Sequence, residues 1–147
     1  MTPLLISAVA IAATLALATL AGALVNRRAG ALRETTASTE AGFTEITSDL
    51  GLSGTGPTIV HFSAVWCGPC AGVRRVVNQV CADLNGQGHD VAHVEIDMDA
   101  DPAAARRLSV LSLPTTFIFD ADGRQRYRTS GVPKAVDLRS VLVDLLA

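Results

Sequence analysis

The chain has 147 residues, with 12 basic and 14 acidic side chains and a formal net charge of −2. This length allows one domain of ordinary size and a further segment. Because the charges nearly balance, form no basic stripe and are accompanied by only 4% aromatic residues, the composition gives no support for nucleic-acid binding.

An uncharged apolar segment runs from Pro3 to Val25. At a rise of about 1.5 Å per residue, a helix of this length spans on the order of 34 Å, which is enough to cross a bilayer. A cleaved signal peptide is the alternative, with Ala21-Gly22-Ala23 as its small-residue cleavage site, but it would have a basic start and a shorter apolar core. The sequence therefore predicts a single membrane anchor over residues 1–25.

Basic side chains flank only the C-terminal end of this anchor, at Arg27, Arg28 and Arg33. The positive-inside rule places that flank, and the domain that follows it, in the cytoplasm. Residues 26–40 are polar without an apolar period, so we expect a flexible tether that reaches on the order of 20 Å. The domain is then expected over residues 41–147, with a short first strand near Phe43.

A mostly apolar, β-rich run from Thr58 to Ala64 predicts a central strand that is buried on both faces. The sequence Trp66-Cys67-Gly68-Pro69-Cys70 follows it and leads into a helical pattern that ends at Gly86 and Gly88. Six apolar side chains of that pattern share one helix face: Val73, Val76, Val77, Val80, Cys81 and Leu84.

Cys67 and Cys70 are separated by two residues, so that at the start of a helix their sulfurs face the same side and can form a disulfide. The positive end of the helix stabilises a thiolate on the exposed first cysteine, and only a thiolate attacks a disulfide. Cys67 is therefore the candidate nucleophile, and Cys70 the candidate resolving thiol.

Zinc binding and a structural disulfide are the alternatives for this cysteine pair. A zinc site needs four ligands, but the chain has no second CxxC or HxxxH pair. A structural disulfide fits less well with three cysteines, an odd number that suits a mostly reducing compartment. The third, Cys81, is expected to be a buried free thiol.

The remaining elements are expected in this order: a strand from Val91 to Ile96, a short helix from Asp101-Pro102 to Leu108, and a hairpin of Thr115–Phe119 and Arg124–Thr129. A closing amphipathic helix from Pro133 to Leu146 is expected to face the core with four side chains: Val136, Val141, Leu142 and Leu145. This order predicts an α/β fold with a mixed central sheet and helices on both faces.

The pentapeptide from Trp66 to Cys70 resembles the active site of the thioredoxin family, and the resemblance extends from about Phe43 to the C-terminus. Leu113-Pro114-Thr115 and Gly131-Val132 lie where thioredoxins have a cis-proline loop and the loop before the last helix. The resemblance implies a thioredoxin-like fold in which Pro114 is cis and faces the cysteines.

The resemblance also implies the surroundings of the nucleophile. Trp66, Gly68 and Pro69 are expected to form an exposed rim, and Leu113 to offer backbone groups to an extended substrate segment. Gly131 is expected to let its loop approach the site closely. The alternatives are an ordinary strand-edge proline at position 114 and an ordinary loop glycine at position 131. No metal or cofactor is expected in the domain.

Two histidines depart from the family's pattern. His61 stands where thioredoxins usually have a buried aspartate, and His93 stands where they often have a lysine. Because a partly buried neutral imidazole is a usable base near pH 7, His61 is a candidate acceptor for the proton of Cys70. The alternative is that both are ordinary core or edge histidines.

These features predict a membrane-anchored thiol–disulfide oxidoreductase that reduces protein disulfides and is itself recharged by an upstream thiol reductant. By resemblance, Gly68-Pro69 between the cysteines is the usual dipeptide of the reducing members. One alternative is an outward-facing domain that acts in cytochrome c maturation or disulfide correction, since many membrane-tethered relatives face the oxidising side. The other is a redox-inert module that docks partners with its cis-proline groove.

Overall fold

The computed structural model describes residues 3–27, 29–35 and 50–147. The predicted strand near Phe43, the predicted domain start at residue 41 and residues 36–40 of the predicted tether lie outside the described residues.

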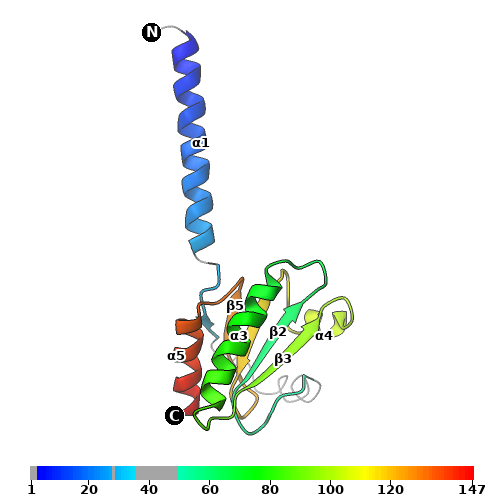
Figure 1. Ribbon diagram of the computed structural model, residues 1–147. Helices are drawn as coiled ribbons and strands as arrows, with labels where there is room; N and C mark the ends of the chain where they lie inside the picture. The colour runs from blue at the N-terminus through cyan, green and yellow to red at the C-terminus, as the bar shows by residue number, and fades with distance from the viewer. Residues whose placement is uncertain (1–2, 28, 36–49) are drawn as a thin grey trace.

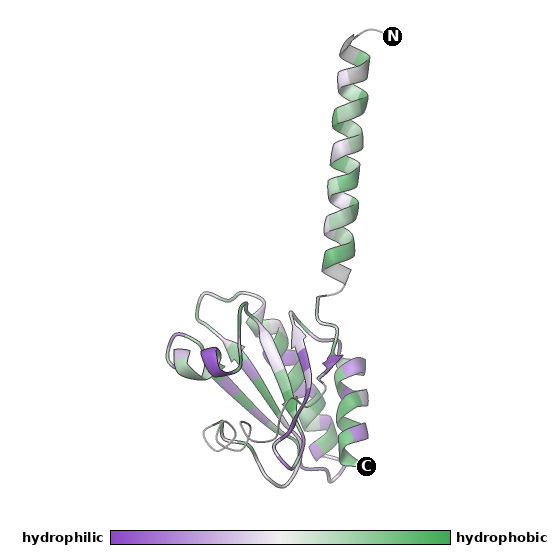
Figure 2. Cartoon of the chain, turned by 180° about the vertical axis from the view of Figure 1, so that it is seen from behind, coloured by the Kyte–Doolittle hydropathy of each residue, from purple (hydrophilic) through white to green (hydrophobic). Residues whose placement is uncertain are grey.

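The first helix, α1, extends from Pro3 to Arg27 and stands apart from the rest of the chain (Figure 1). Most of its residues are hydrophobic along the length of the helix (Figure 2), and none of residues 7–25 is buried. The predicted apolar helix is therefore present and is long and apolar enough to cross a membrane. A signal sequence near the N-terminus can also be this long and this apolar.

A five-stranded sheet forms the centre of the domain, in the order β1-β5-β4-β2-β3. Its strands are β1 (Arg33–Glu34), β2 (Thr58–Ser63), β3 (Ala92–Asp97), β4 (Thr115–Phe119) and β5 (Gln125–Ser130). Because β2 pairs with β3 in parallel and with β4 antiparallel, the sheet is mixed, as the sequence predicts. All six residues of β2 are buried, which confirms the prediction of a central strand.

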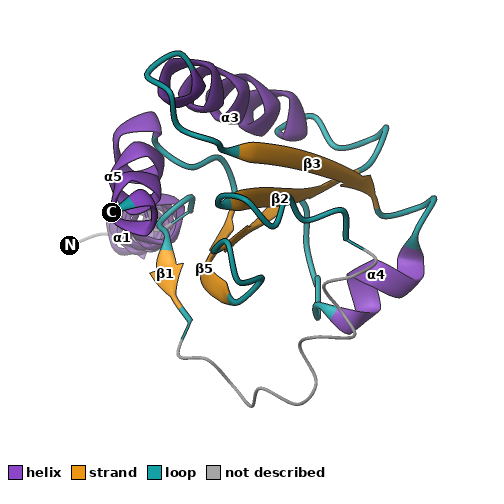
Figure 3. Cartoon of the chain, turned by 90° about the horizontal axis from the view of Figure 1, so that it is seen from below, coloured by secondary structure: helices purple, strands orange, loops and turns teal. Residues whose placement is uncertain are grey.

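Helices cover both faces of this sheet (Figure 3). Helices α3 (Cys70–Asn85) and α5 (Ala135–Leu146) lie on one face, and the short α4 (Pro102–Arg107) lies on the other. Successive side chains of β2 point to opposite faces of the sheet and so belong to two hydrophobic cores. Ile59 packs with α3 and α5, whereas Val60 and Phe62 pack on the side of α4. His61 lies on the α3 face with Ile59, which places an imidazole inside the apolar layer.

Helix α3 buries the side chains that its apolar period predicts, with Val76 partly buried beside them. Helix α5 differs from its prediction, because Val136 is 69% exposed and Leu138 is fully buried. The predicted contacts of Val141, Leu142 and Leu145 with the core are confirmed, and the fully buried Leu138 lies one helical turn before Leu142. Val136 lies two residues before Leu138, and therefore on nearly the opposite side of the helix.

The segment that follows α1 also differs from the predicted flexible tether. Residues 33–34 form β1, which pairs antiparallel with β5, and the N–H of Thr35 donates to the carbonyl oxygen of Arg126 over 2.8 Å. Leu32 packs against the core beneath α5. The edge of a sheet offers unpaired backbone groups, and a passing segment of polar sequence can satisfy them without any apolar period of its own.

Candidate active site

Cys67 and Cys70 form a disulfide, with an Sγ–Sγ distance of 1.99 Å and a Cα–Cα distance of 5.5 Å. Regular helix begins at Cys70, so Cys67 lies in the turn that precedes α3 rather than in its first turn. This turn is closed by the N–H of Cys70, which donates to the carbonyl oxygen of Cys67 over 3.3 Å. Cys67 is 9% exposed and Cys70 is 2% exposed, so Cys67 is the more accessible of two buried residues rather than the exposed cysteine that the sequence predicts.

Three loops meet around this disulfide at the end of β2. Leu113 packs against both cysteines, and the Leu113–Pro114 peptide bond is cis, as the resemblance implies. The N–H of Gly131 donates to the carbonyl oxygen of Pro114 over 2.9 Å, which joins the loop before α5 to the cis-proline loop. Gly131 has a φ of +90°, a left-handed conformation that favours glycine.

The predicted rim residues are exposed beside the disulfide. Trp66 is 65% exposed, and its indole N–H donates to Asp99 Oδ2 over 2.9 Å. Gly68 and Pro69 are also exposed. The structure therefore brings all the predicted rim and loop residues to the carboxyl end of β2.

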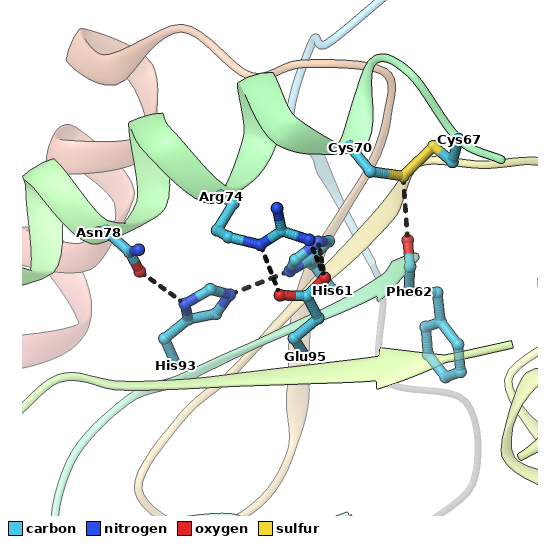
Figure 4. Close-up of polar contacts among 8 residues, drawn as sticks. All are labelled: His61, Phe62, Cys67, Cys70, Arg74, Asn78, His93 and Glu95. Carbon is cyan, nitrogen blue, oxygen red and sulfur yellow. Dashed lines mark hydrogen bonds and ion pairs between the residues drawn. A yellow bond between two sulfur atoms is a disulfide. The ribbon is translucent and has the colours of Figure 1, made fainter. Parts of the chain in front are cut away.

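A polar cluster lies beneath α3, on the same face of β2 as the disulfide (Figure 4). His61 Nδ1 lies 3.0 Å from His93 Nε2, and His93 Nδ1 lies 3.0 Å from Asn78 Oδ1. Because an amide oxygen only accepts, His93 donates from Nδ1 and its Nε2 accepts the proton of His61 Nδ1. In this chain of hydrogen bonds the neutral His61 carries its proton on Nδ1, so its Nε2 is unprotonated and can accept a proton.

The bare nitrogen of His61 is buried and has no hydrogen-bond partner among the described residues. It lies 3.7 Å from Glu95 Oε1, so a proton on Nε2 would form an ion pair with that carboxylate. Glu95 is held by a bidentate contact from Arg74, with Nε donating to Oε2 over 2.8 Å and Nη2 to Oε1 over 2.5 Å. The neighbouring Cys70 Sγ lies 3.9 Å from the carbonyl oxygen of Phe62, which follows His61 in β2.

The charges of the cluster follow from this geometry. Burial lowers the pKa of His61 to about 4, although the nearby Glu95 carboxylate opposes the shift. Burial also lowers the pKa of His93. The hydrogen bond from Arg74 lowers the pKa of Glu95 to about 2, and Ser63 contributes in the same direction. At neutral pH the cluster therefore contains two neutral imidazoles beside a neutralised ion pair.

Glu95, Arg74 and Asn78 are functional candidates that the sequence analysis missed. Glu95 lies two residues after His93 on β3 and opposite His61 in the parallel pairing, so the period of a strand places it on the same face. Arg74 and Asn78 are one turn apart on α3, beside its apolar stripe and on the side that faces β3. Their one-turn spacing can be read from the sequence, but nothing there distinguishes these two side chains from those of an ordinary solvated helix face.

Cys81 is the free cysteine, and it is 8% exposed in the core beneath α5. Burial raises its pKa to about 11, so the thiol stays protonated and unreactive near neutral pH. Within residues 3–27, 29–35 and 50–147, no three His, Cys, Asp or Glu side chains gather in a way that could hold a metal ion.

The dithiol at the end of a central strand, followed by a helix and faced by a cis-proline loop, defines the site of a thiol–disulfide oxidoreductase. The thioredoxin family model matches residues 34–144. Since this match covers most of the sequence, the chain belongs to the thioredoxin family, whose members act on disulfides in proteins.

Individual relatives agree with this assignment. The chain is 39% identical to the thioredoxin of Mycolicibacterium smegmatis over 90 residues, which cover 61% of this chain and 79% of that protein. It is 38% identical to a thioredoxin-like protein of Synechocystis over 82 residues, covering 56% and 74% of the two chains. Among solved structures, chloroplastic thioredoxin z aligns with a TM-score of 0.57 and 27% identity, covering 77% of this chain and 95% of that chain.

Acidification is expected to destabilise the fold through His61. Its pKa falls from 6.5 in the unfolded chain to about 4 in the folded protein, so the unfolded state takes up the proton first. The free energy of unfolding should therefore be highest above pH 6.5 and fall by about 2–3 kcal/mol as the pH drops to 4. His93 contributes with the same sign.

Chemical denaturation of the full chain in detergent micelles at a series of pH values measures this dependence. The variant His61→Gln cannot be protonated and should show a shallower fall over the same window. An equal slope in wild type and variant would contradict the assignment of the buried imidazole as the titrating group.

Proposed function

We propose that this protein is a membrane-anchored reductant of protein disulfides, working through the Cys67–Cys70 pair. The observation that carries the proposal is the redox-active pair itself, closed as a disulfide at the meeting point of three loops with its first sulfur partly accessible. A purely structural disulfide would not need an open, apolar rim around it.

The reaction begins with the thiolate of Cys67, which attacks one sulfur of the substrate disulfide and expels the other as a thiolate. Cys70 then loses its proton and attacks Cys67 Sγ, so that the second substrate sulfur leaves. The substrate gains two electrons and becomes a dithiol, and the Cys67–Cys70 disulfide forms. An upstream thiol reductant restores the reduced pair.

Substrate binding is assigned to the rim. The backbone beside cis-Pro114, together with Leu113, would pair with an extended substrate segment, and Trp66, Gly68 and Pro69 would contact it near Cys67. Gly131 would help to position this surface, because its N–H donates a hydrogen bond to the carbonyl oxygen of Pro114.

His61 is the proposed acceptor for the proton of Cys70. Its bare Nε2 is oriented by His93 and Asn78, and it lies on the face of β2 that α3 covers. After protonation, Nε2 would donate to Glu95, only 3.7 Å away, which offsets the cost of a buried positive charge.

Reduction of insulin tests the function directly. The reduced full chain in detergent micelles should cleave the insulin disulfides and precipitate the free chains, whereas Cys67→Ser should be inactive because the nucleophile is missing. Cys70→Ser should stop at a mixed disulfide that survives non-reducing electrophoresis. Wild-type protein without insulin-reducing activity would instead indicate the redox-inert docking module.

The role of His61 is tested on the second step of the reaction alone, in which Cys70 attacks Cys67 Sγ of the mixed disulfide. His61→Gln retains a side chain that can donate to His93 but cannot accept a proton at neutral pH. Resolution of a preformed mixed disulfide should slow by about 10²–10⁴-fold, the usual contribution of a general base. His61→Asp should restore much of the rate.

The matched control is His89→Gln, which removes an imidazole from the exposed loop after α3. Its rate should equal that of wild type. An unchanged rate in His61→Gln would show that solvent, rather than this imidazole, takes the proton.

We place the redox domain in the cytoplasm, because Arg27, Arg28 and Arg33 all follow the apolar helix. A membrane-impermeant maleimide should then label Cys67 only after the cells are permeabilised, following reduction by a reagent that reaches both sides. Cys67→Ser is the control for the other thiols. Labelling in intact cells would move the domain outside and favour cytochrome c maturation or disulfide correction.

A further inference from the structure

Residues 29–35, which follow α1, pair along the edge of the sheet rather than linking α1 loosely to the domain. We call residues 29–35 the strap. It pairs with β5 at Arg33 and Glu34, and Gln125 Nε2 donates to Thr35 Oγ1 over 3.0 Å. The N–H of Gly30 donates to the carbonyl oxygen of Ser130 over 2.6 Å. Hydrogen bonds therefore hold the strap along the length of β5.

The direction of the strap brings its first residues to the active-site end of the domain. Because β1 runs antiparallel to β5, Ala29 and Gly30 lie beside the end of β5, where Ser130 and Gly131 leave the sheet. A Cβ atom on Gly30 would lie 2.0 Å from the carbonyl oxygen of Val132, so the two backbones are in direct contact. The same loop holds Pro114 through Gly131.

Helix α1, the candidate membrane span, ends next to Ala29 and Gly30. Helix α1 ends at Arg27, and a single residue separates it from Ala29. With about 3.8 Å between consecutive Cα atoms, the end of the helix lies within about 8 Å of the strap. Val25 lines one hollow together with Ser130 and Gly131, and Figure 1 shows α1 leaving the domain at the end where α3 begins.

Exposed apolar side chains gather in the loops at this same end. Val65 is 96% exposed and Leu111 is 93% exposed. The former follows β2 and the latter precedes β4, and the pairing of Phe62 with Thr115 puts these two loops side by side. Trp66 and Val132 are also exposed there. Contiguous exposed apolar residues typically mark a surface for protein or membrane contact.

We propose that this dithiol acts on disulfides of other membrane proteins that lie directly at the bilayer surface. The inference rests on the proposed reductase function and on the anchor, and it does not depend on which side of the membrane the domain faces. The strap keeps the Cys67 end of the domain close to the point where the chain enters the bilayer. A cystine next to a membrane span can reach Cys67 there, whereas one held far above the surface cannot.

Single-turnover reduction in phosphatidylcholine vesicles tests the inference. The probes are two single-span peptides, each with a fluorophore attached through a disulfide to one cysteine. In the near probe the cysteine directly follows the span; in the far probe a rigid helical spacer of about 20 residues raises it by about 30 Å.

Cleavage releases the fluorophore thiol and leaves the Cys67–Cys70 disulfide. The reduced wild-type chain should cleave the near probe at least about tenfold faster, a difference in activation free energy of about 1.4 kcal/mol.

An insertion separates the effect of the strap from that of the anchor. About 20 Gly/Ser residues between Arg28 and Ala29 leave every contact of the strap with β5 intact but release the domain from the surface. This variant should lose the preference for the near probe. The matched control places the same insertion before Pro3, on the other side of the span, and should retain the wild-type preference.

Two results would overturn the inference: equal rates on both probes with wild type, or a preference that survives the insertion after Arg28. In both cases the wild-type chain would still reduce insulin in detergent. Failure to reduce insulin and either probe would overturn the proposed function, and the inference with it.

Discussion

The complete burial of β2 is the constraint on which the rest of the structure depends. The strand is paired on both edges and covered on both faces, so its polar side chains can find partners only inside the protein. At Val65 the chain emerges abruptly into solvent, with Cys67 and Cys70 immediately after this transition. The nucleophile therefore lies at the boundary between a rigid core and an open surface, where a rigid scaffold can position a reactive group that a substrate can still reach.

The same burial explains the chemistry available behind the disulfide. A carboxylate on β2 would introduce a negative charge near the resolving thiol and raise the cost of forming its thiolate. In this chain the imidazole of His61 is neutral, and the negative charge of Glu95 lies on the neighbouring strand, paired with Arg74. The polar groups behind the disulfide are thus distributed over two strands and one helix, with His93 and Asn78 fixing which nitrogen of His61 is free.

In the proposed membrane-anchored protein, the strap would affect the orientation of the domain as well as its location. A flexible tether would let the domain rotate freely above a membrane, so its active site would sample all directions. Pairing of residues 33–35 with β5 would restrict that rotation, because it holds the strap beside the active-site loops and next to the end of α1. The glycines at positions 30 and 131 make this possible, because both adopt positive φ angles where two backbones meet.

Local patterns in the sequence predicted much of the fold and the central part of the site. The strand β2, the apolar face of α3 and the hairpin of β4 and β5 are each visible in a short window, because burial on one or two faces imposes a fixed period. The start of α4 was also predictable, since Asp101 caps the helix through its side chain and Pro102 occupies the first turn. The buried face of α5 was predicted in part: Val141, Leu142 and Leu145 contact the core, but Val136 is exposed and Leu138 takes its place.

The sequence by itself determined the dithiol, its place after a buried strand and the unusual imidazole at position 61, because these depend on residue identity and short-range spacing. Only the tertiary structure decided that Glu95 and Arg74 accompany His61, and that residues 29–35 bind to β5 beside Gly131. These contacts join residues that lie 21 positions apart at Arg74 and Glu95 and 100 positions apart at Gly30 and Ser130. No local period shows which edges and faces of a sheet will meet.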